Sequence, residues 1–243
     1  MVFQGSESEL NSLYSLLDGI TATCIVVFGI IFALIVFYKA KKMEAKLLIY
    51  AALMGGFASL LWLGSCSSFL SVIVFGGHLE PIGLYGILGY MWVAPAAIIG
   101  LYIGAELMLP EKKKIIVIIY AGLSIIFELL LFLDFLLFDP MKSIEFEISG
   151  SSIDSNFVYG HPIFILIVIF LVSVLLLNGI GSINKAIQST GVVRKKFGFM
   201  AITFIIFVLV AALDSLLSPG PALFIARMGM IVCAILLYFA LKP

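Results

Sequence analysis

The chain is poor in charged residues, in cysteine and in histidine, and each scarcity excludes a class of protein. Only 12% of its 243 residues are charged and 63% are hydrophobic, which leaves too little polar surface for a water-soluble fold. Three cysteines are too few for a disulfide framework, and with two histidines they lack metal-ligand spacing, so no metal site and no cofactor is predicted. Fourteen basic and fourteen acidic residues cancel, which argues against binding to nucleic acid.

Seven apolar runs are each long enough to cross a bilayer as a helix. The hydrocarbon core of a bilayer takes about 20 helical residues to cross. The runs cover residues 18–38, 47–74, 82–109, 115–138, 162–183, 197–217 and 221–241. The sequence therefore predicts one domain, residues 1–243, that is an all-α seven-transmembrane helix bundle in a lipid bilayer.

Basic residues collect in alternate connections between these runs. Twelve of the fourteen Lys and Arg residues lie between runs one and two, three and four, five and six, or after run seven. Cytoplasmic segments near span ends carry such an excess, so this positive-inside pattern predicts an N-terminus outside and a cytoplasmic C-terminus. We expect a multi-pass protein of the cell membrane, with anionic lipid at the basic cytoplasmic loops.

The longest connection, residues 139–161, has a strand-like pattern. Apolar residues alternate with glutamates over 144–148, a Gly-Ser-Ser turn follows at 150–152, and a second short apolar stretch occupies 157–159. This pattern predicts an extracellular β-hairpin between helices 4 and 5. Two interpretations stay open, a lid over an outward-facing cavity and a solvated loop that happens to alternate.

The third run carries a stripe of small residues at helical spacing. Helices associate in lipid through close approach of small side chains, so this stripe predicts a central, closely packed helix. Its glycines are Gly86, Gly89, Gly100 and Gly104. Pro95, which lacks a backbone N–H, predicts a kink by freeing the carbonyl of Met91. Packing within the chain is favoured over a dimer face.

Three ionisable residues lie inside predicted spans, at a similar depth in the outer third of the membrane. They are Glu128, Asp214 and Arg227. Each costs about 2.5 to 3.5 kcal/mol to insert, so each needs a partner or a purpose. If all three meet, one negative charge is in excess, and a cationic ligand, a proton on Glu128 or a metal ion held with further oxygens would balance it. The structural alternative is an Asp214–Arg227 pair that fixes helix packing, with Glu128 protonated.

Further polar residues are weaker candidates for lining a cavity above these charges. They are Ser65, Ser68, Tyr85, Tyr90 and Ser124, the last on the same helix face as Glu128. The alternative is that they are ordinary residues of the membrane interface.

The motifs of known seven-span families are missing. The last run has Arg227 but no lysine for a retinal Schiff base, and no Asn-Pro-x-x-Tyr. Glu106, Leu107 and Met108 stand where G-protein-coupled receptors have an acidic-Arg-aromatic triplet. No run contains the histidines of intramembrane zinc hydrolases, and no Pro-Gln dipeptide of sugar transporters occurs.

Three functions remain in contention. The first is a receptor-like or sensory module that binds a small ligand or cation in an outward-facing cavity and acts through a separate cytoplasmic or membrane partner protein. The second is a secondary transporter coupled through a protonatable intramembrane carboxylate. The third is a non-catalytic membrane subunit or scaffold. The chain is not expected to be an enzyme, because no nucleophile, base and orienting group converge in the sequence.

Overall fold

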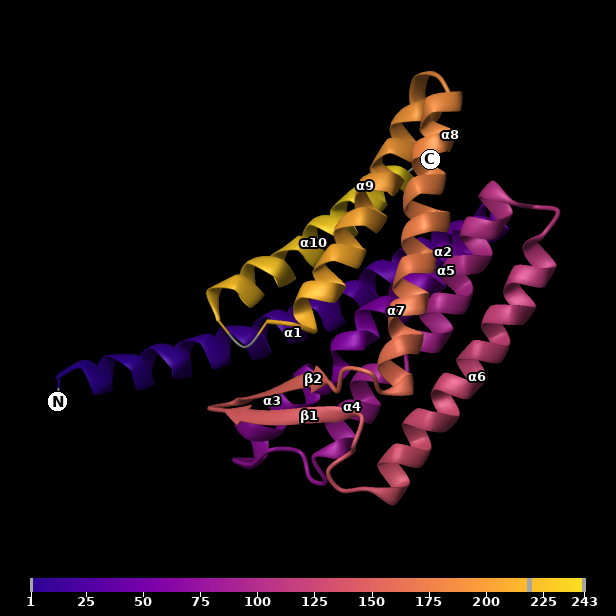
Figure 1. Cartoon of the computed structure of the whole chain (residues 1–243). Helices are drawn as coiled ribbons and strands as arrows, with labels where there is room; N and C mark the ends of the chain where they lie inside the picture. The colour runs from indigo at the N-terminus through magenta and orange to yellow at the C-terminus, as the bar shows by residue number, and fades with distance from the viewer. Residues whose placement is uncertain (1, 218–219, 242–243) are drawn as a thin grey trace.

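The computed structural model describes residues 2–217 and 220–241, and its architecture is helical apart from one hairpin (Figure 1). Seven helical segments are long and apolar enough to cross a membrane, which fits an all-α multi-pass membrane protein. The elements are α1 (Val2–Lys42), α2 (Lys46–Ser59), a 3₁₀ turn (Leu60–Trp62), α3 (Leu63–Phe75), α4 (Gly83–Tyr90), α5 (Val93–Met108), α6 (Lys113–Leu137), β1 (Ile144–Ser149), β2 (Ser152–Phe157), α7 (Pro162–Val174), a π-helical segment (Leu175–Ile180), α8 (Gly181–Gln188), α9 (Gly191–Asp214) and α10 (Pro221–Leu241).

Helix α1 begins much earlier than the predicted first span. The apolar run starts at residue 18, but the helix starts at Val2, and its first part projects from the bundle (Figure 1). Hydropathy locates the part of a helix that lies in lipid, whereas the helix itself continues wherever the residues tolerate it, as Glu and Leu do here. Asp18 therefore lies inside α1, not at its end.

Three of the membrane-spanning segments are interrupted. The second contains the 3₁₀ turn Leu60–Trp62, and the fifth contains the π-helical segment Leu175–Ile180, neither of which the sequence predicted. The third breaks between α4 and α5 at Met91 and Trp92. This break directly precedes Pro95, where the missing N–H leaves the carbonyl of Met91 without its helical partner.

The segment between α6 and α7 forms an antiparallel hairpin of β1 and β2. Ile144 pairs with Phe157 at its open end, and Gly150 adopts a φ of +59° at the turn. The second strand starts at Ser152, five residues before the predicted apolar stretch, so that Phe157 is its last residue. Ile144 and Phe157 are buried among residues of α4, α6 and α7, which seats the hairpin on the end of the bundle.

Helix α5 is central and contacts α2, α6 and α7. The small residues of this span meet other parts of the same chain. A Cβ at Gly86 would lie 3.0 Å from Ile144, one at Gly100 would lie 3.3 Å from Met54, and one at Gly104 would lie 2.9 Å from Leu177. The stripe is therefore used for packing within the chain.

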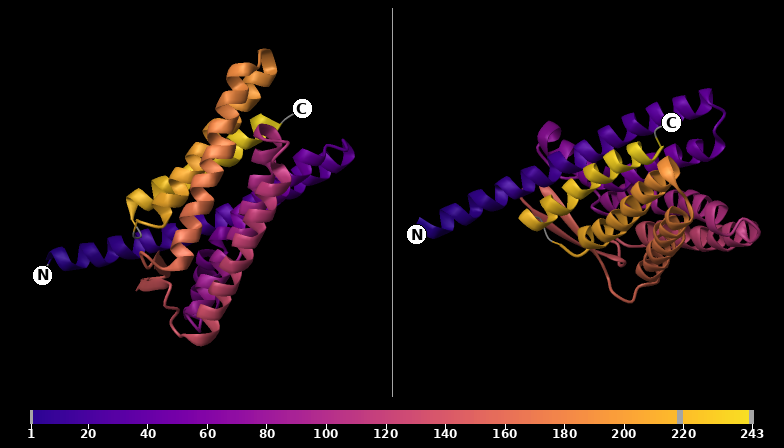
Figure 2. Two further views of the ribbon diagram at one scale, coloured as in Figure 1. Left: turned by 45° about the vertical axis from the view of Figure 1, so that its right-hand side comes forward. Right: turned by 90° about the horizontal axis from the view of Figure 1, so that it is seen from above.

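The connections α1–α2, α5–α6 and α8–α9 lie toward one end of the bundle, and the hairpin lies at the opposite end (Figure 2). The three connections and the helix turns beside them carry most of the lysines and arginines. Large apolar side chains cover the sides between the two ends, as on α6, where Ile118 and Leu136 are exposed. Such a belt of exposed apolar residues suits contact with lipid.

Candidate functional site

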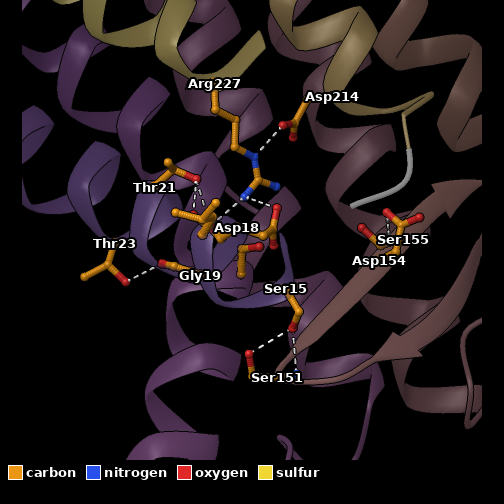
Figure 3. A network of polar contacts seen from close by, with 12 residues as sticks. Ser15, Asp18, Gly19, Thr21, Thr23, Ser151, Asp154, Ser155, Asp214 and Arg227 are labelled. Atoms are coloured by element: carbon orange, nitrogen blue, oxygen red, sulfur yellow. Dashed lines mark hydrogen bonds and ion pairs between the residues drawn. The ribbon is translucent and has the colours of Figure 1, made fainter. Parts of the chain in front are cut away.

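Arg227 lies between two aspartates near the hairpin end of the bundle (Figure 3). Its Nε donates to Oδ1 of Asp214 at 2.8 Å, and Nη1 donates to the backbone carbonyl of Asp18 at 3.1 Å. Nη1 also lies 2.7 Å from Oδ1 of Asp18, as an ion pair without hydrogen-bond alignment. The side chains of Arg227 and Asp18 are 6% and 4% exposed, against 22% for Asp214. We call Asp18, Asp214 and Arg227 the ion cluster.

Asp18 is the residue that sequence reasoning missed. It stands at the first residue of an apolar run and was counted as the boundary of a span. The residues before it are compatible with a helix and carry α1 well beyond that boundary, which places Asp18 inside the helix. Arg227 thereby has two carboxylate partners, Asp214 and, in place of the predicted Glu128, Asp18, and the ion cluster holds one excess negative charge.

Asp154 brings a further carboxylate to the same region. It lies on β2, is buried, and accepts hydrogen bonds from the backbone N–H of Ser155 at 3.0 Å and from the side chain of Asn156 at 3.3 Å. Burial raises the pKa of its carboxyl above the ordinary value, and the charges of Glu147 and Asp214 raise this pKa further. Among the ion pairs of the described residues, none involves Asp154.

A cavity of about 520 Å³ extends from this charged region into the bundle. Asp154, Asp214 and Arg227 line its polar end together with three of the predicted cavity residues, Ser65, Tyr85 and Tyr90. The remaining walls are mostly apolar side chains of α1, α2, α5, α7, α9 and α10. The site is thus a long apolar chamber with carboxylates and one guanidinium at one end, which suits a ligand with a polar head and an apolar body.

Hydrogen bonds hold the hairpin over the polar end of the cavity. Tyr90 and Ser155 share a hydrogen bond of 2.9 Å between their hydroxyls. The hairpin turn is attached to α1, because Ser15 Oγ accepts from the backbone N–H of Ser151 at 2.7 Å and also pairs with its hydroxyl (Figure 3). On the bundle side, the hydroxyl of Tyr85 donates to Ser65 Oγ at 3.3 Å. The segment that covers the cavity is therefore bonded to both α1 and α4.

Glu128 does not join the ion cluster, which corrects the predicted trio. It lies on α6, is half-buried, and does not line the cavity; its Oε1 is buried and has no hydrogen-bond partner among the described residues. Helix α6 packs against α5 and α7 on the side of the bundle away from α10 (Figure 1). Similar depth in the membrane therefore did not mean proximity, because helices four and seven are not neighbours.

Ser68 and Ser124 lie outside the cavity, so the cavity-lining interpretation does not hold for these two residues. Both are buried and have hydroxyls without a hydrogen-bond partner among the described residues. Ser124 lies one turn from Glu128 on α6. Within the part of the chain that the structure describes, no three His, Cys, Asp or Glu side chains are grouped so as to hold a metal ion.

Comparisons of this chain with protein-family models, with curated proteins and with solved structures found no match.

Proposed function

We propose that this chain is a receptor-like or sensory membrane protein that binds a small ligand with a cationic group in the cavity beneath the hairpin. The observation that carries the proposal is the polar end of the cavity, where the carboxylates of Asp154 and Asp214 face the chamber with Arg227 as the single guanidinium. With Asp18 behind Arg227, three carboxylates stand against one positive charge. A ligand cation would balance this excess, since buried charge is tolerated only where it is paired.

The positive-inside pattern supports an orientation in which the hairpin faces the outside and the lysine-rich connections face the cytoplasm. Binding would then tighten the outer ends of α1, α4, α9 and α10 around the ligand, and the same rigid helices would carry the shift to the basic ends. A separate cytoplasmic or membrane partner protein would read that shift there. Anionic lipid would hold the basic ends in place.

The test is thermal unfolding of the purified full chain in a neutral detergent, with small organic cations, neutral molecules of the same size, and anions. We expect cations to raise the melting temperature in a dose-dependent way, because a ligand that binds only the folded state stabilises it. Asp154→Asn should weaken this effect, whereas Glu145→Gln, a change at an exposed glutamate of the same hairpin, should leave it unchanged. No response to any cation would overturn the proposal.

One observation favours the transporter as a second candidate. The buried Oε1 of Glu128 has no hydrogen-bond partner among the described residues, and a proton on this carboxylate would remove its uncompensated charge. If Glu128 couples transport, Glu128→Gln should abolish proton-dependent uptake in liposomes and leave the melting temperature unchanged. Unchanged uptake would remove this candidate.

The scaffold receives less support. A scaffold would need small residues free to bind partner helices, and Gly86, Gly100 and Gly104 pack against other elements of the same chain.

A further inference from the structure

The cavity is long in the direction of the helices. On α10 its lining runs from Arg227 to Leu237, which corresponds to about 15 Å at the rise of an α-helix. On α9 it runs from Asp214 back to Thr203, a similar length. Away from Asp214 and Arg227, the walls carry mostly apolar side chains and small residues such as Ala234 and Gly55, and the uncharged polar groups among them include those of Cys24, Ser59, Thr203 and Cys233. Charge is concentrated at one end only.

The cavity also reaches the side of the bundle. Phe28 of α1 lines it and is 66% exposed, which sets it apart from the other large apolar side chains that line it. Phe28 lies ten residues after Asp18 on the same helix, so this opening is about 15 Å from the ion cluster along α1. In a bilayer that position is deep in the hydrocarbon layer. The opening therefore faces lipid tails and not water.

Trp62 gives an independent sign that the cavity takes a ligand. Its side chain is 5% exposed and lines the cavity, yet its indole N–H has no hydrogen-bond partner among the described residues. A buried donor without an acceptor is unfavourable unless something absent from the chain itself satisfies it. An acceptor on a bound molecule would do so, but an ammonium head offers none, so this donor indicates an occupied cavity and does not identify the head group.

We infer that the ligand is a single-chain amphiphile with a protonated amine head, which comes from the surrounding bilayer. This inference rests on the proposed function and names its ligand class. The ammonium lies against Asp154 and Asp214, and the chain follows α10 past Trp62 toward Leu237 and Gly55. The side opening at Phe28 admits the chain from lipid.

The head and the chain contribute differently to binding. A chain that moves from lipid into an apolar cavity gains little, because both surroundings are equally apolar. The selectivity of binding therefore comes from the head. On binding, the ammonium leaves the membrane interface and lies against the carboxylates of Asp154 and Asp214. The chain sets a limit of length, since a tail longer than the chamber does not fit.

The test uses the full chain in vesicles of neutral phosphatidylcholine. Trp92→Phe leaves Trp62 as the only tryptophan, since the chain has two, and removes no hydrogen bond, since Trp92 Nε1 has no partner among the described residues. Dodecylamine brominated on its chain should then quench Trp62 fluorescence, because bromine quenches on contact. Unbrominated dodecylamine should relieve the quenching by competition. Dodecanol and dodecanoate should compete at least tenfold more weakly.

A variant that fills the far end of the chamber tests where the chain lies. Gly55→Leu is suited to this, because a Cβ at Gly55 would meet only Leu237, at 4.0 Å, so the backbone accommodates the new side chain. It should weaken competition by dodecylamine at least tenfold and leave competition by hexylamine unchanged. Gly122→Leu is the matched control, since Gly122 is exposed on α6 with no atom within 4 Å of its Cβ position, and it should change neither.

The outcomes separate the inference from the proposed function. If neither amine competes or stabilises, both fail. If both amines bind but Gly55→Leu affects neither, the cavity binds cations and the placement of the chain is wrong. If dodecanol or dodecanoate competes as well as dodecylamine, the amine head is wrong. Binding of dodecylamine that Gly55→Leu alone weakens supports the whole inference.

Discussion

Replacing Arg227 by methionine is the sharpest test of the ion cluster. In the structure Arg227 faces both Asp18 and Asp214, so its loss leaves the buried carboxylate of Asp18 and the partly buried carboxylate of Asp214 with no cation. Either single change, Asp18→Asn or Asp214→Asn, instead leaves one carboxylate and one guanidinium, a neutral pair. Breaking a buried pair by removing one partner costs about 3–5 kcal/mol, and that cost applies to Arg227→Met. The two asparagine variants keep a compensated charge and should each lose less than Arg227→Met, about 1.5–3 kcal/mol for Asp214→Asn, which loses a hydrogen bond between charged groups.

Thermal unfolding in detergent, monitored by circular dichroism, measures the order of these losses of stability. For a chain of this size about 2–4 °C of melting temperature corresponds to 1 kcal/mol, so Arg227→Met should lower it by roughly 6–20 °C. Ile235→Met introduces the same residue at an exposed position of α10 and should change it little. The triple variant Asp18→Asn, Asp214→Asn, Arg227→Met should recover most of the loss. If Asp214→Asn is as damaging as Arg227→Met, Arg227 depends on Asp214 alone and the three-residue cluster is refuted.

Three further changes test the packing, the hairpin and the buried acid. Gly104→Ala should lower the free energy of unfolding by about 1–3 kcal/mol, because its Cβ would lie 2.9 Å from Oδ1 of Asn178. Gly122→Ala, whose Cβ would have no atom within 4 Å, should be neutral or slightly stabilising in the same thermal assay. Ser15→Ala should speed amide hydrogen exchange at the hairpin turn, since it removes the acceptor of a 2.7 Å bond, and unchanged exchange would count against this attachment. Burial raises the pKa of Asp154, so its contribution to stability is full below its ordinary pKa and is lost as pH rises through the pKa of the folded state. Asp154→Asn should therefore gain stability relative to the natural chain as pH rises. A difference in melting temperature that stays constant with pH would contradict this.

The sequence predicts a structural element correctly where one local physical property determines that element. Apolar runs mark helices that cross lipid, and seven such helices are present. Pro95 marks a break because a missing N–H acts locally. The π-helical segment Leu175–Ile180, which packs against α5 and α9, could not be read from composition, since its residues are ordinary for a helix.

The site was harder to predict, because depth along a helix is a property of sequence and adjacency between helices is not. Asp214 and Arg227 come together across a short connection, so their pairing was accessible from the sequence. Glu128 lies at a comparable depth, but its helix packs on the other side of α5. Which helix faces which is decided by long-range packing of small and large side chains, for which a single sequence holds no direct record.

The missed acids share a cause that bears on how the cavity works. Asp18 lies at the boundary of the predicted first span, and Asp154 lies in the predicted hairpin. In the structure α1 continues through Asp18 and projects beyond the bundle, and the hairpin, which is seated on the end of the bundle, is attached to this helix. They cover the polar end of the cavity through Ser15, Ser151 and Tyr90, while the side of the cavity stays open at Phe28. A cavity covered toward water and open toward lipid favours molecules that partition into the membrane first, and the buried carboxylates then select among them by charge. If the proposed ligand binds there, the two segments that carry Asp18 and Asp154 would give the site its selectivity.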